Sequence, residues 1–188
     1  MPQYFAALTI VLLMGLVLTR ALLMKRQGIR AIHFGNIDKK DFLIPPFALF
    51  YFYIVFAHAF PLPTPSRQEL FRSAIASWIG VALCAAGLSL FVAGLVSFGR
   101  SFRVGIDTEH PDELITSGVF AYSRNPIYVA FALVLLGQFL VFPNRVLLVY
   151  AAAGFWLLHR QILREEGFMQ KHYGAEFEEY RRRVRRYL

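Results

Sequence analysis

The sequence predicts an all-α, polytopic membrane protein with about five transmembrane helices and a cytoplasmic helical segment at its C-terminal end. Composition is the first reason, because 57% of the 188 residues are hydrophobic and 16% are aromatic. The second reason is that long windows of the chain contain no Asp, Glu, Lys or Arg. A helix rises about 1.5 Å per residue, so about 20 apolar residues cross a hydrocarbon core of about 30 Å.

The charge-free windows give the predicted helices in chain order. The first becomes long enough if its helix continues through Met24 while Arg20 snorkels to the interface. The last becomes long enough if residues 143–163 form one helix with Arg145 and Arg160 near its ends. Five spans are therefore expected. The windows are 2–19, 42–66, 73–99, 125–144 and 146–159.

The third window is the longest, and as a straight helix of about 40 Å it should tilt or protrude from the bilayer. It carries small residues at four-residue spacing, a pattern that lets helices approach closely in lipid. We therefore expect this helix to pack centrally; the alternative is that Gly and Ala are simply common in membrane helices. Ala76, Gly80 and Cys84 have this spacing, and the further small residues Gly87, Ala93 and Gly94 lie beyond them.

Loop charges predict the topology. Basic residues collect between spans one and two, between spans three and four, and after span five, whereas the opposite side receives only Arg67, Arg72 and Arg145. The positive-inside rule then places the N-terminus outside and the C-terminus in the cytoplasm. Lys25 and Arg26 follow the first apolar run, the reverse of a cleaved signal peptide, so we expect a retained anchor. The protein is expected in an inner or plasma membrane, or in the endoplasmic reticulum of a eukaryotic cell.

Several partner classes are not expected. The formal net charge is +8, but the basic residues sit beside membrane ends and no nucleic-acid-binding motif is visible, so anionic lipid headgroups explain them better than nucleic acid. Cys84 is the sole cysteine, which excludes an intramolecular disulfide. The five histidines lack metal-ligand spacing, so no metal site is expected.

The start of the fourth window offers a candidate anion site. Asn125 is a good N-cap residue, and Pro126 suits the first helical position, where its missing N–H costs nothing. The unpaired N–H groups of that helix end, with the bidentate donor Arg124 beside them, could bind a carboxylate or a phosphate. The alternative is that Arg124 is an ordinary snorkelling residue at a cytoplasmic helix end.

A pair of glutamates continues the fifth helix just beyond the membrane. Glu165 and Glu166 could hold a cationic or hydroxyl-rich ligand, or they could form a solvated helix face. Gly174 is predicted to end this helix. A second, amphipathic helix is predicted after it, with Phe177 and Tyr180 on the apolar side and arginines that meet lipid phosphates.

The combination of these elements resembles a known family. The spacing L-x-x-x-G-x-x-x-x-x-R-x-P-x-Y is followed by an apolar hairpin, the paired glutamates and a YG-x-EF-x-x-Y run; its residues are Leu114, Gly118, Arg124, Pro126 and Tyr128. Over residues 95–188 this resembles the integral-membrane methyltransferases that include isoprenylcysteine carboxyl methyltransferase and the phospholipid N-methyltransferases. The domain division follows: residues 1–98 are expected to form three transmembrane helices, and residues 99–188 the methyltransferase-like region.

The resemblance implies that this region binds S-adenosylmethionine at the cytoplasmic membrane boundary and that a lipidic or apolar acceptor enters from the bilayer. Arg124 and Asn125 would be catalytic. Arg100 and Arg103 would orient an anionic acceptor or a lipid headgroup, although snorkelling explains them equally well. The implied cofactor-binding residues are Ile115, Gly118, Tyr122, Arg124, Asn125, Pro126, Tyr128, Glu165 and Glu166.

Within that implied site, Arg124 and the helix start at Asn125 would bind the carboxylate of the cofactor. The two glutamates would bind its ammonium group or ribose hydroxyls. Its adenine or sulfonium would be enclosed by Tyr122, Tyr128 and the backbone around Ile115 and Gly118. One position departs from the family, which commonly has histidine where this chain has Asn125. Asparagine accepts no proton at neutral pH, so proton removal is not expected there. Two other functions stay open: a non-catalytic scaffold or transporter subunit, and a membrane reductase that uses a nicotinamide cofactor.

Overall fold

The computed structural model describes residues 1–26, 44–60, 62–64, 68–98 and 114–188. The described part is helical and contains no β-strand, only isolated bridges such as Ser123 with Arg185. In chain order its elements are α1 (Pro2–Arg26), α2 (Ile44–Ala59), α3 (Ala74–Phe98), the short 3₁₀ helix η3 (Gly118–Ala121), α4 (Pro126–Val141), α5 (Arg145–Tyr173) and α6 (Ala175–Arg183).

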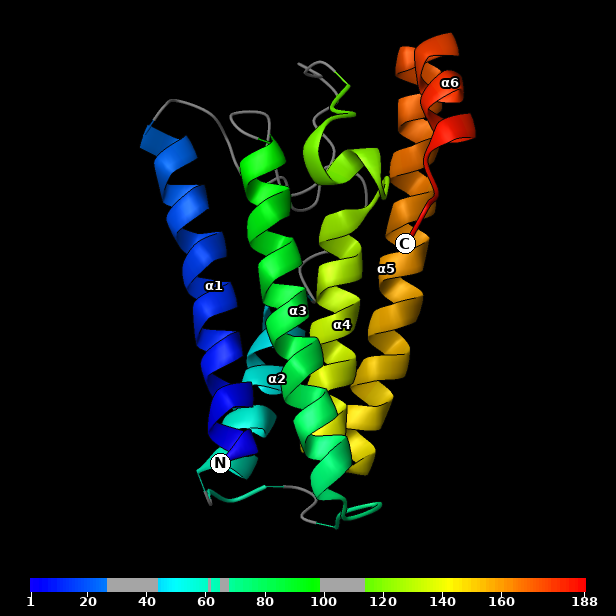
Figure 1. Cartoon of the computed structure of the whole chain (residues 1–188). Helices are drawn as coiled ribbons and strands as arrows, with labels where there is room; N and C mark the ends of the chain where they lie inside the picture. Colours follow the sequence, from blue (N-terminus) through cyan, green and yellow to red (C-terminus); the bar gives the residue numbers. More distant parts are fainter. Residues whose placement is uncertain (27–43, 61, 65–67, 99–113) are drawn as a thin grey trace.

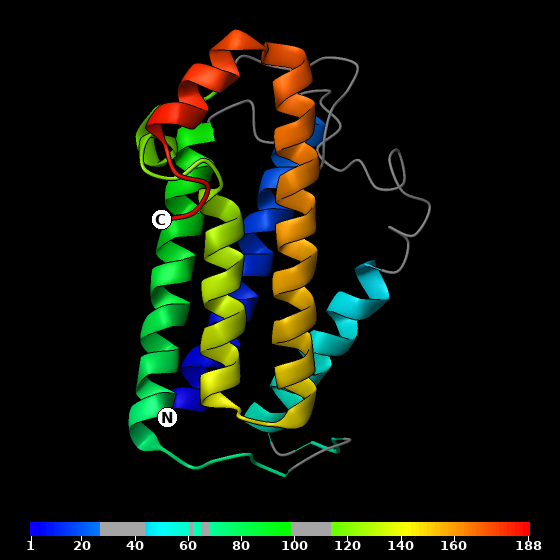
Figure 2. The same ribbon diagram turned by 90° about the vertical axis from the view of Figure 1, so that its right-hand side faces the viewer.

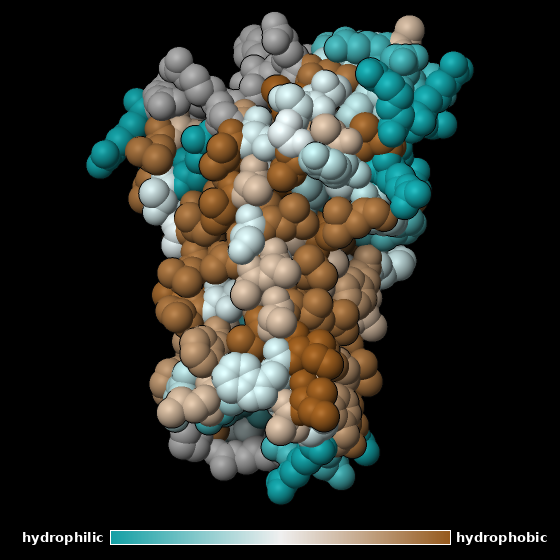
Figure 3. All heavy atoms as spheres, viewed as in Figure 1, coloured by the Kyte–Doolittle hydropathy of each residue, from teal (hydrophilic) through white to brown (hydrophobic). Residues whose placement is uncertain are grey.

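The helices form an elongated bundle in which α1, α3, α4 and α5 run side by side (Figures 1 and 2). The N-terminus lies at one end of the bundle. The last turn of α3 lies at the opposite end, together with η3 and α6 (Figure 1). Hydrophobic residues cover the middle of the face in Figure 3, and hydrophilic residues gather at its two ends. This distribution is typical of a protein that crosses a bilayer, as the composition predicts.

Helix lengths agree with the sequence in part. By length and composition, α1, α3 and α5 can cross a membrane, with 25, 25 and 29 residues. The second and fourth windows also form helices, but α2 and α4 have 16 residues each, short of the roughly 20 that a spanning helix needs. Prolines limit α4, because Pro126 fixes its first turn and Pro143 follows its last. The all-helical membrane fold is confirmed, and the count of five spans stays a prediction.

Small residues bring α3 and α4 into close contact. A Cβ added at Gly80 would lie 2.6 Å from the carbonyl oxygen of Gly137, and one added at Gly87 would lie 2.8 Å from that of Ala130. Only glycine allows backbones to approach this closely. The predicted close approach of the third helix to a neighbouring helix is therefore confirmed at these positions. Cys84 and Gly94 are buried on the same helix.

A buried amide joins α4 to α1. Gln138 is fully buried, and its Nε2 donates to the carbonyl oxygen of Ala6 at 2.7 Å. Hydrogen bonds of this kind hold membrane helices together where the hydrophobic effect between helices is weak. The bundle thereby fixes α4, whose first turn carries the candidate site.

Candidate functional site

The site begins where α4 begins. Residues 123–125 run beside the last residues of the chain, 184–188, which we call the C-terminal segment. The backbone N–H of Arg124 donates to the carbonyl oxygen of Arg185 at 2.9 Å, within the bridge that pairs Ser123 with Arg185. Gly174, with φ of 52°, ends α5 and turns the chain into α6, which returns it toward α4. The predicted helix end at Gly174 is confirmed.

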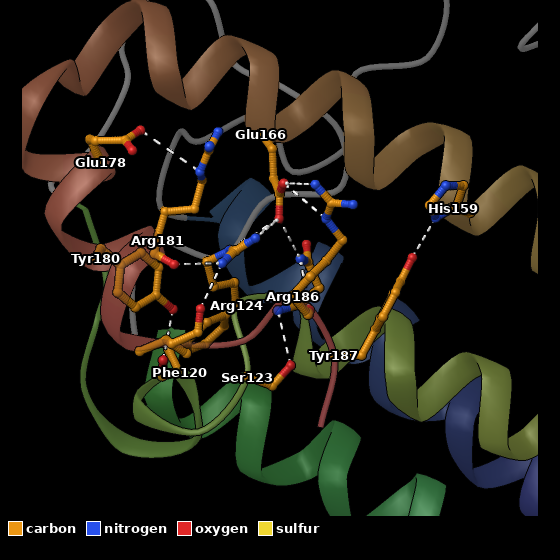
Figure 4. A network of polar contacts seen from close by, with 12 residues as sticks. Phe120, Ser123, Arg124, His159, Glu166, Glu178, Tyr180, Arg181, Arg186 and Tyr187 are labelled. Carbon is orange, nitrogen blue, oxygen red and sulfur yellow. Dashed lines mark hydrogen bonds and ion pairs between the residues drawn. The ribbon is translucent and has the colours of Figure 1, made fainter.

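Glu166 lies at the centre of a polar network that joins α4, α5 and the C-terminal segment (Figure 4). Its Oε1 accepts from Nε and Nη2 of Arg124, at 3.1 and 2.9 Å. Its Oε2 accepts from Nε and Nη2 of Arg186, at 3.0 and 2.8 Å. A carboxylate held by two guanidinium groups is firmly positioned, because charge-assisted bonds are stronger than neutral ones.

Arg124 is committed to neighbours as well as to Glu166. Its side chain is 8% exposed, and its Nη1 donates to the carbonyl oxygens of Arg181 and Val184, at 3.1 and 2.6 Å. Four of the five N–H groups of a guanidinium are therefore used by described partners. Arg124 holds α5 and the C-terminal segment together, and its assignment to a cofactor carboxylate stays a prediction.

Asn125 occupies the N-cap position of α4, but its side chain does not cap the helix. Its Nδ2 instead donates to Glu166 Oε1 at 3.3 Å and to the carbonyl oxygen of Arg186 at 3.1 Å. The predicted helix start with Pro126 in the first turn is confirmed, whereas side-chain capping by Asn125 is wrong. The physical reason is that the amide is drawn into the carboxylate network, while the oxygen of Ser123 accepts from the Asn125 backbone N–H at 3.1 Å.

Glu165 has a different set of partners. Its Oε1 accepts from the hydroxyl of Tyr128 on α4 and from Nε2 of Gln161 at 3.0 Å. Both donors are neutral, whereas Glu166 faces two arginines. The adjacent glutamates of the sequence are thus physically distinct groups, one neutralised by cations and the other bound by uncharged donors.

The other predicted cofactor-binding residues, Ile115, Gly118 and Tyr122, lie in or next to η3. Gly118 opens η3 with φ of 63°, and a Cβ there would meet the side chain of Ser97, whose oxygen accepts from the Val119 N–H at 3.2 Å. Ile115 is half-buried on the approach to η3, and Tyr122 is 78% exposed. Among the described residues, no hydrogen bond joins the Tyr122 side chain to either glutamate. Arg100 and Arg103 lie outside the described residues.

Packing of α6 fixes the outer side of the network. Phe177 and Tyr180 are buried against α5 residues such as Met169, as the amphipathic pattern predicts. The Tyr180 hydroxyl donates to the carbonyl oxygen of Phe120 at 2.7 Å, and burial raises the pKa of Tyr180 to about 12. The hydrogen bond with Glu166 raises the pKa of Arg186 above its ordinary value. Both groups therefore keep their protons across the physiological range.

Sequence reasoning missed Arg186 and the contact between His159 and Tyr187. Arg186 is one of five arginines within residues 181–186, and nothing in its spacing separates it from the surface ones. His159 Nδ1 and the Tyr187 hydroxyl lie 2.5 Å apart. A contact between residues 28 positions apart follows from the return of the chain through α6 and cannot be read from periodicity. Within the described ranges, no group of three or more His, Cys, Asp or Glu side chains could hold a metal ion.

A helical membrane protein with a buried arginine–carboxylate network at one bundle end is the class that this fold and site define. The chain belongs to the phospholipid methyltransferase family, which matches residues 75–176. The match includes α3, α4 and all of α5, together with Arg124, Glu165 and Glu166.

Curated relatives are similar to this chain over only part of their own length. A probable protein-S-isoprenylcysteine O-methyltransferase of Oryza sativa subsp. indica is 30% identical over 111 residues, covering 57% of this chain and 58% of the relative. The protein-S-isoprenylcysteine O-methyltransferase of Schizosaccharomyces pombe is 30% identical over 101 residues, covering 52% of this chain and 43% of the relative. The match thus spans less than two thirds of these relatives. No solved structure matches the chain significantly.

Proposed function

We propose that the protein is a membrane-embedded methyltransferase that transfers a methyl group from S-adenosylmethionine to a lipidic or apolar acceptor at the cytoplasmic membrane face. The observation that carries the proposal is that Arg124 and Asn125 bind Glu166, and Tyr128 binds the adjacent Glu165, at one bundle end in a chain of a methyltransferase family. Residues that the sequence separates by about forty positions thereby form one polar site.

The cofactor carries a carboxylate, an ammonium and ribose hydroxyls, so a site for it needs donors and acceptors together. Of the two glutamates, Glu165 is the better acceptor for the ammonium or the ribose, because its described donors, Tyr128 and Gln161, are uncharged. Glu166 is already neutralised by Arg124 and Arg186. We assign Glu166 to positioning: it holds Arg124 and the start of α4 in place beside the site.

When bound, the cofactor supplies an electrophilic methyl group on a sulfonium. The protein then needs to align the acceptor with that group and to exclude water, and such positioning supplies much of the rate in reactions of this kind. The network can do this because two helices and the C-terminal segment share it. A fixed frame at the polar end of α4 leaves the apolar remainder of the helix to meet an acceptor in the bilayer.

Binding and transfer should be tested on the same purified protein. Saturable binding of S-adenosylmethionine in lipid nanodiscs is expected, with affinity lowered at least about tenfold in Glu165→Gln, the size of effect when a charged hydrogen-bond partner is lost. Glu179→Gln is the matched control, because Glu179 lies on the exposed surface of α6. Incubation with methyl-labelled cofactor and a membrane extract should yield a labelled product.

Two results would contradict the proposal. If no S-adenosylmethionine binds at millimolar concentration to folded protein, the chain is a non-catalytic scaffold or transporter subunit. If NADPH binds and competes with S-adenosylmethionine in a thermal-shift assay, with no methylated product, the chain is a nicotinamide-dependent reductase. Normal cofactor affinity in Glu165→Gln would overturn the assignment of that residue alone.

A further inference from the structure

A groove of about 560 Å³ lies between α4 and α5 and reaches the C-terminal segment. This volume is within the range of about 300–1,000 Å³ that is typical of small-molecule sites. Of the predicted site residues that the structure describes, only Tyr128 lines it. The lining residues are Tyr128, Val129, Ala132, Leu133 and Leu136 of α4, Phe155, Leu158, His159 and Ile162 of α5, and Tyr187 and Leu188.

The groove has an apolar length and a polar end. Along the two helices its walls are aliphatic and aromatic, and Phe155 and Leu136 extend it away from the polar network. At the other end lie Tyr128, His159 and Tyr187, and the last two are joined by their hydrogen bond. Figure 4 shows the Tyr187 ring reaching across toward His159 on α5.

This polar end adjoins the proposed cofactor site. Tyr128 lines the groove and also donates its hydroxyl to Glu165 Oε1. Ile162, one turn before Glu166, lines the groove from α5. Tyr128 therefore links this end of the groove to Glu165.

The lining also limits the charge of a ligand. It contains no Lys, Arg, Asp or Glu among the described residues, and its hydrogen-bonding side chains are two phenols and one imidazole. A phosphate or carboxylate head at this end would meet no side-chain cation in the described lining, so it would gain no charge-assisted hydrogen bond from it. An uncharged hydroxyl or thiol could donate to the imidazole and accept from a phenol.

We infer that this groove is the acceptor site, that it takes a single-chain amphiphile with an uncharged hydroxyl or thiol head, and that His159 receives the proton of that head. The inference rests on the proposed function. In the step, the acceptor oxygen or sulfur forms a bond to the methyl carbon, and the carbon–sulfur bond of the sulfonium breaks with its electron pair going to sulfur. The proton of the head passes to the imidazole of His159, so the charge of the sulfonium ends on histidine.

His159 suits this role where Asn125 does not. A neutral imidazole has one nitrogen that donates and one that accepts. If Nδ1 donates to the Tyr187 hydroxyl, Nε2 is the accepting nitrogen. Asn125, at the position where the resembling family commonly has histidine, uses its amide on Glu166 and Arg186. Tyr187 thus positions the imidazole, and Tyr128, whose hydroxyl is bound to Glu165, is the other titratable side chain in the described lining.

Occupancy of the groove can be measured without activity. The probes are three sixteen-carbon chains, each with a diazirine in the chain and with a hydroxyl, a carboxylate or a phosphate head, applied to the full chain in nanodiscs. Photolabelling by the alcohol is expected on α4 and α5 residues of the groove and should fall about tenfold in Ala132→Phe, since overfilling a packed site costs that order of affinity. The matched control is Ala85→Phe, an exposed position on α3.

The role of His159 has a separate readout. His159→Gln should keep cofactor binding and alcohol labelling but lose methyl transfer to hexadecanol and hexadecanethiol by about 100-fold or more in kcat, as general bases contribute. Tyr187→Phe should lose less, because the imidazole remains. Equal labelling in Ala132→Phe, stronger labelling by the phosphate, or an unchanged kcat in His159→Gln would overturn the inference. Absence of cofactor binding would instead overturn the proposed function, since labelling needs no cofactor.

Discussion

At the scale of single residues, Glu166 shows why burial and pairing must be considered together. Its side chain is 9% exposed, and each of its oxygens is bound to a different arginine. A buried ion pair contributes little net stability when it forms, because desolvation offsets attraction. Removing one partner is different, since it leaves the other charge buried and unpaired.

Glu166→Ala should therefore lower the free energy of unfolding by about 3–5 kcal/mol. Arg124, 8% exposed, would be left without its carboxylate. Thermal unfolding in detergent measures the effect, with the loss of soluble monomer as the readout. Arg183→Ala is the control and should cost less than about 1 kcal/mol, because its pair with Glu179 is 67% and 61% exposed. Equal losses in the two variants would contradict the prediction.

Asn125→His tests what the departure from the family pattern does. One Nδ2 group serves both Glu166 Oε1 and the Arg186 carbonyl oxygen, and a single ring N–H of histidine can serve only one of them. We expect a loss of about 1 kcal/mol, the net worth of a hydrogen bond. Backbone hydrogen exchange in residues 184–188 should become faster. An unchanged exchange rate would show that the second hydrogen bond is dispensable.

At the scale of elements, glycines allow the backbones of α3 and α4 to come into direct contact. Gly80 and Gly137 face each other so closely that a Cβ on either would lie 2.6 Å from the opposing carbonyl oxygen. Neither backbone can yield without moving its helix. Because α4 carries Arg124 and Asn125 at its start, the geometry of the site depends on this contact.

Gly80→Ala should lower the unfolding temperature in detergent, since the new methyl group forces α3 and α4 apart. Gly15→Ala on α1 is the matched control, because a Cβ there has no atom within 4 Å. The control should be neutral or slightly stabilising, as alanine favours helices over glycine by about 0.5–1 kcal/mol. A lower unfolding temperature in the control but not in Gly80→Ala would contradict the role of this contact.

At the scale of the whole molecule, the bundle end with η3 and α6 (Figure 1) carries the Glu166 network and the five arginines of residues 181–186. From the positive-inside rule we expect this end to lie in the cytoplasm. The described residues 62–64 and 68–73, between α2 and α3, lie at the opposite end (Figure 1). The proposed cofactor site would then be open to cytoplasmic S-adenosylmethionine.

Single cysteines can test that topology, because Cys84 is the sole natural one and is buried. In a Cys84→Ala background, Gln68→Cys should react with an impermeant maleimide added outside intact cells. Glu176→Cys on α6 should react only after the membrane is opened. Both positions are exposed. The reverse pattern would invert the topology and place the site on the outer face.

The sequence by itself determined the helices and the polar positions of the site. Charge-free windows set α1 to α5, because bilayers exclude charge, and Pro126 and Gly174 fixed two helix boundaries through their backbone restrictions. Motif spacing selected Arg124 and the two glutamates. These signals are local or periodic, so they can be recognised in the sequence before the fold is known.

Tertiary structure alone decided how those residues are used. It divided two adjacent glutamates into one bound by arginines and one bound by Tyr128 and Gln161. In the folded chain the Asn125 side chain binds Glu166 and the Arg186 carbonyl oxygen and does not cap α4. Of the five arginines near the C-terminal end, Arg186 is the one that pairs with Glu166. The physical reason is that hydrogen-bond partners depend on which surfaces meet, and the return of the chain through α6 brings residues 184–188 against the start of α4.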